Sequence, residues 1–194
     1  LPGKGIQSDG TSIENPFNNV DVDVRMEYPY GEASDEGRAM MQIIHDIAPG
    51  AELVFRTGVL GAVDMVNGID DLADCDIIVD DITYITQPFF EDGIVAKKVD
   101  EVVSNGVSYF TSAGNFGAKS YSGTFNPGSQ ISGINGVPHE FGIGDNYQEV
   151  TVGEEITDGL TDEAHYTLVL QWDDESSFSN TNTDLDIYLM NENG

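Results

Sequence analysis

Apolar residues recur at helical spacing in three segments of the first 115 residues, and short apolar runs lie between those segments. The clearest helical pattern spans 36–47, where apolar side chains fall at the i, i+3, i+4 and i+7 positions of a half-buried helix. This apolar stripe is formed by Met40, Ile43, Ile44 and Ile47. Ser34 or Asp35 is the predicted N-cap, and Pro49 with Gly50 is expected to end the helix.

The remaining periodicity predicts an alternation of strands and helices as far as residue 115. Strands are expected at 20–26, 52–56, 76–82 and 107–112, and further helices at 63–72 and 95–103. Such alternation predicts right-handed crossovers and a parallel sheet, and therefore a doubly wound α/β fold. The largely apolar run at 76–82 is typical of a strand covered on both faces. Ligands of such sheets bind beyond the carboxyl ends of the strands, where Ala113 to Phe116 lie.

The pattern changes after residue 116. Residues 116–136 are rich in Gly, Ser and Asn, which is typical of a long loop or linker. Three candidate strands follow at 147–152, 166–172 and 185–190, separated by acidic turns, and they favour a β-sandwich. We therefore expect an α/β domain over 1–132 and a partial all-β sandwich module over 133–194.

The charge of the chain excludes several classes of partner. Thirty-five acidic residues face seven basic ones, giving a net charge of −28. A nucleic-acid backbone or an anionic membrane surface would repel such a chain. The sequence holds no apolar run of about twenty residues, so we expect no membrane span. The acidic excess fits a secreted or salt-adapted protein, or one that binds cations. Cys75 is the single cysteine and is expected to be a small buried thiol.

One carboxylate, Glu36, continues the apolar stripe of 36–47 at its N-terminal end. A buried carboxylate there costs desolvation energy unless another group pairs with it or the chemistry uses it. The alternative is an ordinary first-turn Glu that the helix dipole favours. His45 lies on the opposite, polar side of the helix and is expected to be solvated. His139 and His165 lack partners at the spacing of zinc ligands.

Two adjacent acids, Asp80 and Asp81, end the apolar run at 76–82. Neighbouring residues of a strand point to opposite faces, so these two carboxyl groups should not share a proton. A solvated sheet edge or a capping role is the expected place for them.

Three segments, taken in order, resemble the subtilisin-like serine peptidases. ASDEGRAMMQIIHDIAPGAEL resembles the helix that carries the catalytic histidine, DIIVDDITY the strand that pairs with substrate, and VDEVVSNGVSYFTSAGN the approach to the Ala-Gly-Asn motif. The resemblance covers roughly residues 34–117 and implies a subtilisin-like core, incomplete in this chain. It places Glu36 at the histidine position, as in the related sedolisins, and Asn115 as oxyanion donor. Thr83, Tyr84 and Gly114 would line the edge that binds an extended peptide.

The chain departs from the family in two ways. Met40 stands where the sedolisins carry a supporting Asp, and neither the Asp-bearing strand nor the Gly-Thr-Ser motif is found. We expect both to lie beyond ends that look cut. We therefore expect this chain to be a central fragment of a secreted serine endopeptidase and to be inactive alone. The whole enzyme would cleave peptide bonds by acyl transfer, with Glu36 as the base. A non-catalytic secreted binding module on a degenerate peptidase scaffold is the alternative, which Met40 favours.

The C-terminal segments QWDDESS and TDLDIYLMNENG resemble β-sandwich modules of the pre-peptidase C-terminal type. Four acids flank two of the expected strands: Asp173, Asp174, Asp184 and Asp186. Clustered carboxylate oxygens suit calcium, although no EF-hand spacing is present and a solvated acidic loop is the alternative. A calcium- or glycan-binding surface protein is therefore a third interpretation. No other cofactor is implied, and the expected partner is a protein or peptide substrate.

Overall fold

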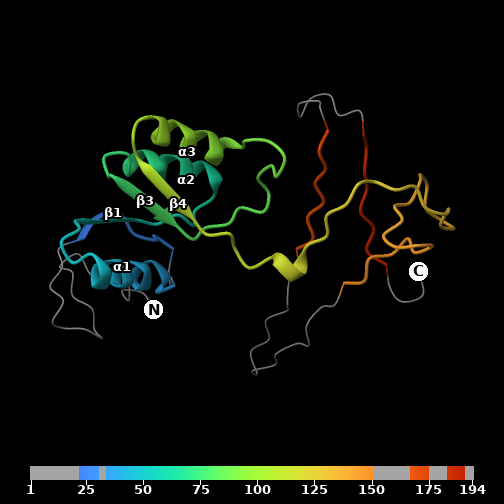
Figure 1. Cartoon of the computed structure of the whole chain (residues 1–194), viewed down its shortest axis with the longest axis horizontal. Coiled ribbons are helices and arrows are strands. Elements are labelled where there is room, and N and C mark those ends of the chain that lie inside the picture. Colours follow the sequence, from blue (N-terminus) through green and yellow to red (C-terminus); the bar gives the residue numbers. More distant parts are fainter. Residues whose placement is uncertain (1–21, 31–33, 151–166, 175–182, 191–194) are drawn as a thin grey trace, which may run out of the picture. The chain divides into compact units, whose positions relative to one another are not determined.

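The computed structural model describes residues 22–30, 34–150, 167–174 and 183–190 (Figure 1). The chain divides into two compact units. The first comprises residues 1–114 together with 169–194, and the second comprises residues 115–168. Each unit is therefore described by itself.

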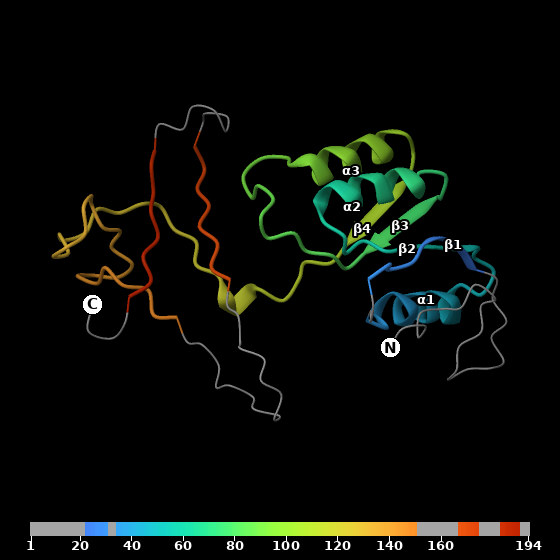
Figure 2. The ribbon, with the colours of Figure 1, turned by 180° about the vertical axis from the view of Figure 1, so that it is seen from behind.

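The first unit contains every helix and strand that the sequence predicts between residues 20 and 112 (Figures 1 and 2). In order they are β1 (Val22–Met26), α1 (Glu36–Ile47), β2 (Leu53–Arg56), α2 (Ala62–Asp71), β3 (Ile77–Asp80), α3 (Ile94–Ser104) and β4 (Ser108–Thr111). Strand β1 pairs with β2, and β3 pairs with β4, both in parallel. Each pair is joined through a helix, as parallel strands require. The predicted alternation is thus confirmed at the level of elements.

The two strand pairs meet at the carboxyl ends of β2 and β3. The Tyr84 hydroxyl, in the loop after β3, donates to the carbonyl of Gly58, in the loop after β2. A methyl group added at Gly58 would lie 3.2 Å from both Ile82 and Met65, so these loops are closely packed. The regular ladders form two separate two-stranded sheets, and a single doubly wound sheet therefore stays a prediction.

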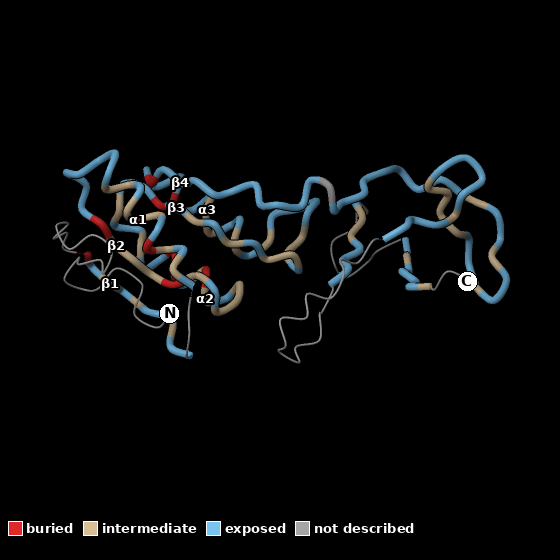
Figure 3. The backbone as a smooth tube through the Cα atoms, turned by 90° about the horizontal axis from the view of Figure 1, so that it is seen from below, coloured by how far each residue is buried: buried red, intermediate tan, exposed pale blue. Residues whose placement is uncertain are grey.

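Among the described residues, the buried hydrophobic side chains form two clusters, both in the first unit (Figure 3). The larger lies between the β3–β4 pair and the helices α2 and α3, and consists of Met65, Ile69, Ile78, Val102 and Val107. The smaller joins α1 to the β1–β2 pair through Val22, Met41 and Leu53. Burial of such side chains contributes about 1.5–3 kcal/mol each relative to exposure. Packing of these side chains therefore holds the helices against the strands.

The β3–β4 pair is covered on one face among the described residues. Ile78 is buried and Tyr109 is half-buried against the helices. Ile77, Val79 and Phe110 point the other way and are 59%, 44% and 59% exposed. The apolar run of β3 predicted cover on both faces, and this expectation is wrong for the chain as described.

Helix α1 buries a different face from the one that its sequence predicts. Ile43 and Ile47 are 61% and 81% exposed, and Glu36 is exposed, whereas Met41 is buried. The reason lies at Gly37, where an added methyl group would fall 2.7 Å from the Phe55 ring of β2. The helix approaches β2 at this glycine, so the face that carries Gly37 and Met41 is the one turned toward the β1–β2 pair.

The described C-terminal residues form no strand ladder. Beyond the short helix η1 (Gly117–Lys119), regular pairing is limited to two isolated bridges, Pro127 with His139 and Gly142 with Asp145. The parts of the three predicted strands that are described, at 147–150, 167–172 and 185–190, lack regular secondary structure. The remaining residues of those strands lie outside the described ranges. The β-sandwich module and the boundary at residue 132 therefore stay predictions.

Candidate functional site at the carboxyl ends of the parallel strands

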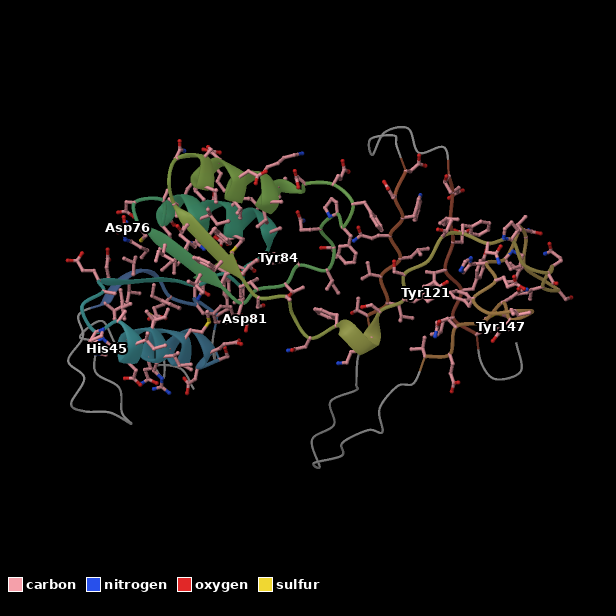
Figure 4. The ribbon with its side chains drawn as sticks, viewed as in Figure 1. His45, Asp76, Asp81, Tyr84, Tyr121 and Tyr147 are labelled. Carbon is pink, nitrogen blue, oxygen red and sulfur yellow. The ribbon has the colours of Figure 1, made fainter. Side chains whose placement is uncertain are left out.

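Two hydrogen-bonded pairs of polar side chains lie where β3 and β4 end, and Figure 4 labels Asp81 there. The register pairs Asp80 with Thr111. Oδ1 of Asp80 accepts hydrogen bonds from the Ile82 amide at 3.0 Å and from the Thr111 hydroxyl at 2.9 Å. Oδ1 of Asp81 accepts a hydrogen bond from the Ser112 hydroxyl. The two carboxylates thus bind different hydroxyl groups, which confirms the prediction that they do not form a shared-proton pair.

A pocket of about 310 Å³ lies beside Asp80, between the strand ends and the helices α2 and α3. Its apolar wall includes Met65, Ile82, Val95 and Val99, while Asp80 and Tyr109 contribute polar atoms. Crevices beyond the carboxyl ends of parallel strands are the usual ligand sites of α/β sheets. The sequence predicted this edge but not the pocket, because the lining residues come from four different elements.

Both tyrosines at the pocket are held in the protonated form. The pKa of Tyr109 is raised well above its usual range, first by burial and then by the neighbouring Asp80 carboxylate. Its hydroxyl oxygen is buried beside that carboxylate. Burial is also the main cause of the raised pKa of Tyr84. The Tyr84 ring packs against the core and its hydroxyl is engaged by Gly58, so this side chain ties two loops together. Thr83, beside it, is exposed.

Glu36 is the first residue of α1, and its side chain is exposed. The desolvation cost of a buried carboxylate is therefore absent, and Glu36 is the ordinary first-turn glutamate of the alternative interpretation. The buried charge in this turn belongs to Arg38, whose guanidinium lies 2.6 Å from the Asp35 carboxylate. Among the described residues, Glu36 makes neither a hydrogen bond nor an ion pair, so its carboxylate is free to meet a ligand at a helix N-terminus. Met40, one turn later, is half-buried.

His45 also departs from its expected surroundings. It is half-buried, and its Nδ1 atom is buried without a hydrogen-bond partner among the described residues. The predicted solvated histidine is therefore wrong, and the cause is the same rotation of α1 that exposes Glu36.

Gly114 and Asn115 follow β4 in the order that the resemblance requires. Gly114 has a φ of +71°, which favours glycine over residues with a side chain. Asn115 is exposed and is the first residue of the second unit, while Glu36, Thr83, Tyr84 and Gly114 belong to the first. The structure thus brings Tyr84 together with the pocket, but the pairing of Glu36 with Asn115 stays a prediction.

Arg56, at the end of β2, is a structural residue that the sequence analysis missed. Its side chain is 4% exposed and makes two hydrogen bonds, of 2.6 and 3.0 Å, to the Asp64 carboxylate. It also contacts Asp71 at 3.1 Å. The Arg56 guanidinium holds the pKa of Asp64 below its usual range. The chain has only seven basic residues, so an arginine at the end of a strand was the signal that could have indicated this structural role.

Two further interactions depend on residues far apart in the chain. In the first unit, the Gln171 amide accepts from the Phe89 backbone at 2.9 Å and donates to the Gln87 carbonyl at 2.8 Å. In the second unit, His139 accepts from the Asn126 amide and meets the Tyr121 hydroxyl, each at 3.0 Å. His139 therefore has a packing role that its isolated place in the sequence does not predict, and His165 lies outside the described ranges.

In the described part of the chain, no group of three His, Cys, Asp or Glu side chains gathers as metal ligands. Of the four C-terminal acids, Asp174 accepts a hydrogen bond from the Thr183 amide at 2.9 Å. None of the helices in the described ranges is long and apolar enough to cross a bilayer.

Comparison of the chain with protein-family models, curated proteins and solved structures gave no match. Function is therefore inferred from the geometry of the site and from the residues themselves.

Proposed function

We propose that this chain is the central part of a secreted serine endopeptidase of the subtilisin-like kind, with the serine nucleophile outside these 194 residues. The observation that supports the proposal is the order β1-α1-β2-α2-β3-α3-β4 with parallel pairing. This order sets the resembling segments on the elements that the family would require. Glu36 begins the helix, the acids of DIIVDDITY end a strand, and Ala-Gly-Asn follows the next strand.

In this proposal each predicted residue has one chemical role. Glu36, exposed at the start of α1, accepts the proton of the attacking serine hydroxyl. Asn115 donates its side-chain amide to the oxyanion that forms at the scissile carbonyl. The strand-end residues Thr83 and Gly114 border the edge to which an extended peptide adds by backbone pairing. Because Glu36 stands where the sedolisins carry their glutamate, the resemblance implies that activity favours acidic pH.

The test uses the complete enzyme that contains this chain. Glu36→Gln should lower kcat by about 10²–10⁴-fold, the usual contribution of a general base, and leave the melting temperature unchanged. Glu52→Gln is the matched control, because Glu52 is another exposed glutamate of the same unit. Asn115→Ala should lower kcat by about 10²–10³-fold, the size measured for the oxyanion asparagine of subtilisin itself. Unchanged turnover in Glu36→Gln would remove Glu36 from the mechanism.

A non-catalytic binding module is the second candidate, and one observation favours it. Met40 is half-buried on α1 where the sedolisins carry an acid, and the exposed Glu36 makes no hydrogen bond with another described residue that would orient it. A fluorophosphonate probe, which labels activated serines, separates the two functions. Labelling of the complete protein supports the enzyme, whereas binding of peptides without labelling supports the module.

A further inference from the structure

The pocket beside Asp80 carries negative charge that no described residue neutralises. Its lining contains two carboxylates, Asp80 and Asp100, and no basic side chain. Asp80 is half-buried and forms no ion pair with the described residues. A carboxylate that loses hydration without gaining a counter-charge is energetically costly. A cation that binds here would therefore gain a favourable electrostatic interaction with the carboxylate.

The nearby basic residues are engaged elsewhere. Arg56 is occupied by Asp64 and Asp71. Lys98 of α3 contacts Asp70 at 3.0 Å and Glu101 at 2.7 Å. Neither of these side chains is free to turn toward Asp80, which leaves its carboxylate open to a bound cation.

The remaining atoms of the pocket define the shape of that molecule. Tyr109 also lines the pocket, with its buried hydroxyl beside the Asp80 carboxylate. The apolar lining includes Met65, Ile82 and Val99, which suit an aliphatic stem. A volume of about 310 Å³ is at the small end of ligand pockets.

We propose that this pocket binds an organic cation, with an ammonium or guanidinium group at Asp80 and its aliphatic stem along the apolar wall of Met65, Ile82 and Val99. A free amine and a lysine or arginine side chain of a peptide share this chemistry. The inference is independent of the proposed peptidase activity, because it depends on the pocket alone.

The test is an NMR titration of the chain with carbon-labelled Met and Ile methyl groups, at about 150 mM NaCl to screen non-specific attraction to its acidic surface. The probes are n-pentylammonium and its neutral counterpart 1-pentanol. Pentylammonium should shift the signals of Met65 and Ile82 saturably and bind about tenfold more tightly than pentanol, the size of one charge-assisted hydrogen bond. Equal affinity of the two probes would overturn the proposal, and this comparison needs no variant.

Variants assign the effect to Asp80. Asp80→Asn keeps the oxygen that accepts from Ile82 and Thr111, and it should weaken pentylammonium binding about tenfold while pentanol is unaffected. Asp46→Asn removes the same charge from an exposed position of α1 and should leave both affinities unchanged. Equal losses in the two variants would show general charge attraction and contradict the site. Acetyl-lysine-amide, compared with acetyl-norleucine-amide, then tells whether a peptide side chain reaches the pocket.

Discussion

At the scale of single residues, Arg56 and Asp64 form a charge pair with two hydrogen bonds in the first unit. The guanidinium is almost fully buried and meets both oxygens of the carboxylate. Burial of one partner without the other would leave an uncompensated charge, so removal of either side chain should be costly. This pair joins the end of β2 to α2 and thereby fixes the loop whose Gly58 carbonyl holds Tyr84.

We expect Asp64→Asn to lower the free energy of unfolding by about 1.5–3 kcal/mol at pH 7, the size of a hydrogen bond to a charged group. Because Arg56 lowers the pKa of Asp64 in the folded state, the stabilisation is complete above the unfolded value near about pH 4 and is lost as the pH falls through the lowered pKa. Urea unfolding of both proteins at several pH values checks this. A difference that does not shrink in acid would contradict the pair, and Asp92→Asn, an exposed control, should have little effect.

The acids at the end of β3 show how far single residues could be predicted. The sequence indicates that Asp80 and Asp81 point to opposite faces, because alternation is a local property of a strand. Their partners Thr111 and Ser112 lie 31 residues away, and only the register of β3 against β4 brings them together. The same limit applies to the pocket, which the alternation alone does not reveal.

At the scale of elements, the sequence predicts which helices and strands exist, but it does not predict which face of a helix is buried. Helix α3 illustrates the first case, because its valine spacing and the glycine after it are local signals, and Gly106 does adopt a φ of +104°. Helix α1 illustrates the second. Its apolar stripe predicts burial of Ile43 and Ile47, but the close approach of Gly37 to Phe55 and the pairing of Arg38 with Asp35 set a different face. The first contact is tertiary and the second is a local polar pair three residues apart, so neither leaves an apolar periodic signal.

The orientation of α1 can be tested with two truncations. Met41→Ala should lower the free energy of unfolding by about 2–5 kcal/mol, because Met41 is buried against the β1–β2 pair. Ile47→Ala should change it by less than about 0.5 kcal/mol, because Ile47 is 81% exposed. Thermal or urea unfolding of the 194-residue chain measures both. The reverse order of effects would show that the stripe of Met40, Ile43 and Ile47 is the buried face after all.

At the scale of the whole molecule, a strong acidic charge accompanies an open apolar sheet face. The net charge of −28 keeps copies of the chain apart by mutual repulsion. The face formed by Ile77, Val79 and Phe110 would, without that repulsion, favour association, because it is apolar and exposed. The sequence indicated the charge directly, but it could not reveal the open face, since a run of apolar residues is equally typical of a covered strand.

Salt should therefore decide whether the chain associates. Raising NaCl from about 10 mM to about 1 M shortens the screening length from about 30 Å to about 3 Å, which removes the repulsion but leaves the apolar attraction intact. Sedimentation velocity should show monomer at low salt and larger species at high salt. The double variant Val79→Thr with Phe110→Thr should stay monomeric at both, because its sheet face is less apolar and the buried Ile78 is unchanged. The control is Ile143→Thr, at a fully exposed position of the second unit, and this variant should associate like the parent chain. If Ile143→Thr abolishes association, the sheet face is not its cause.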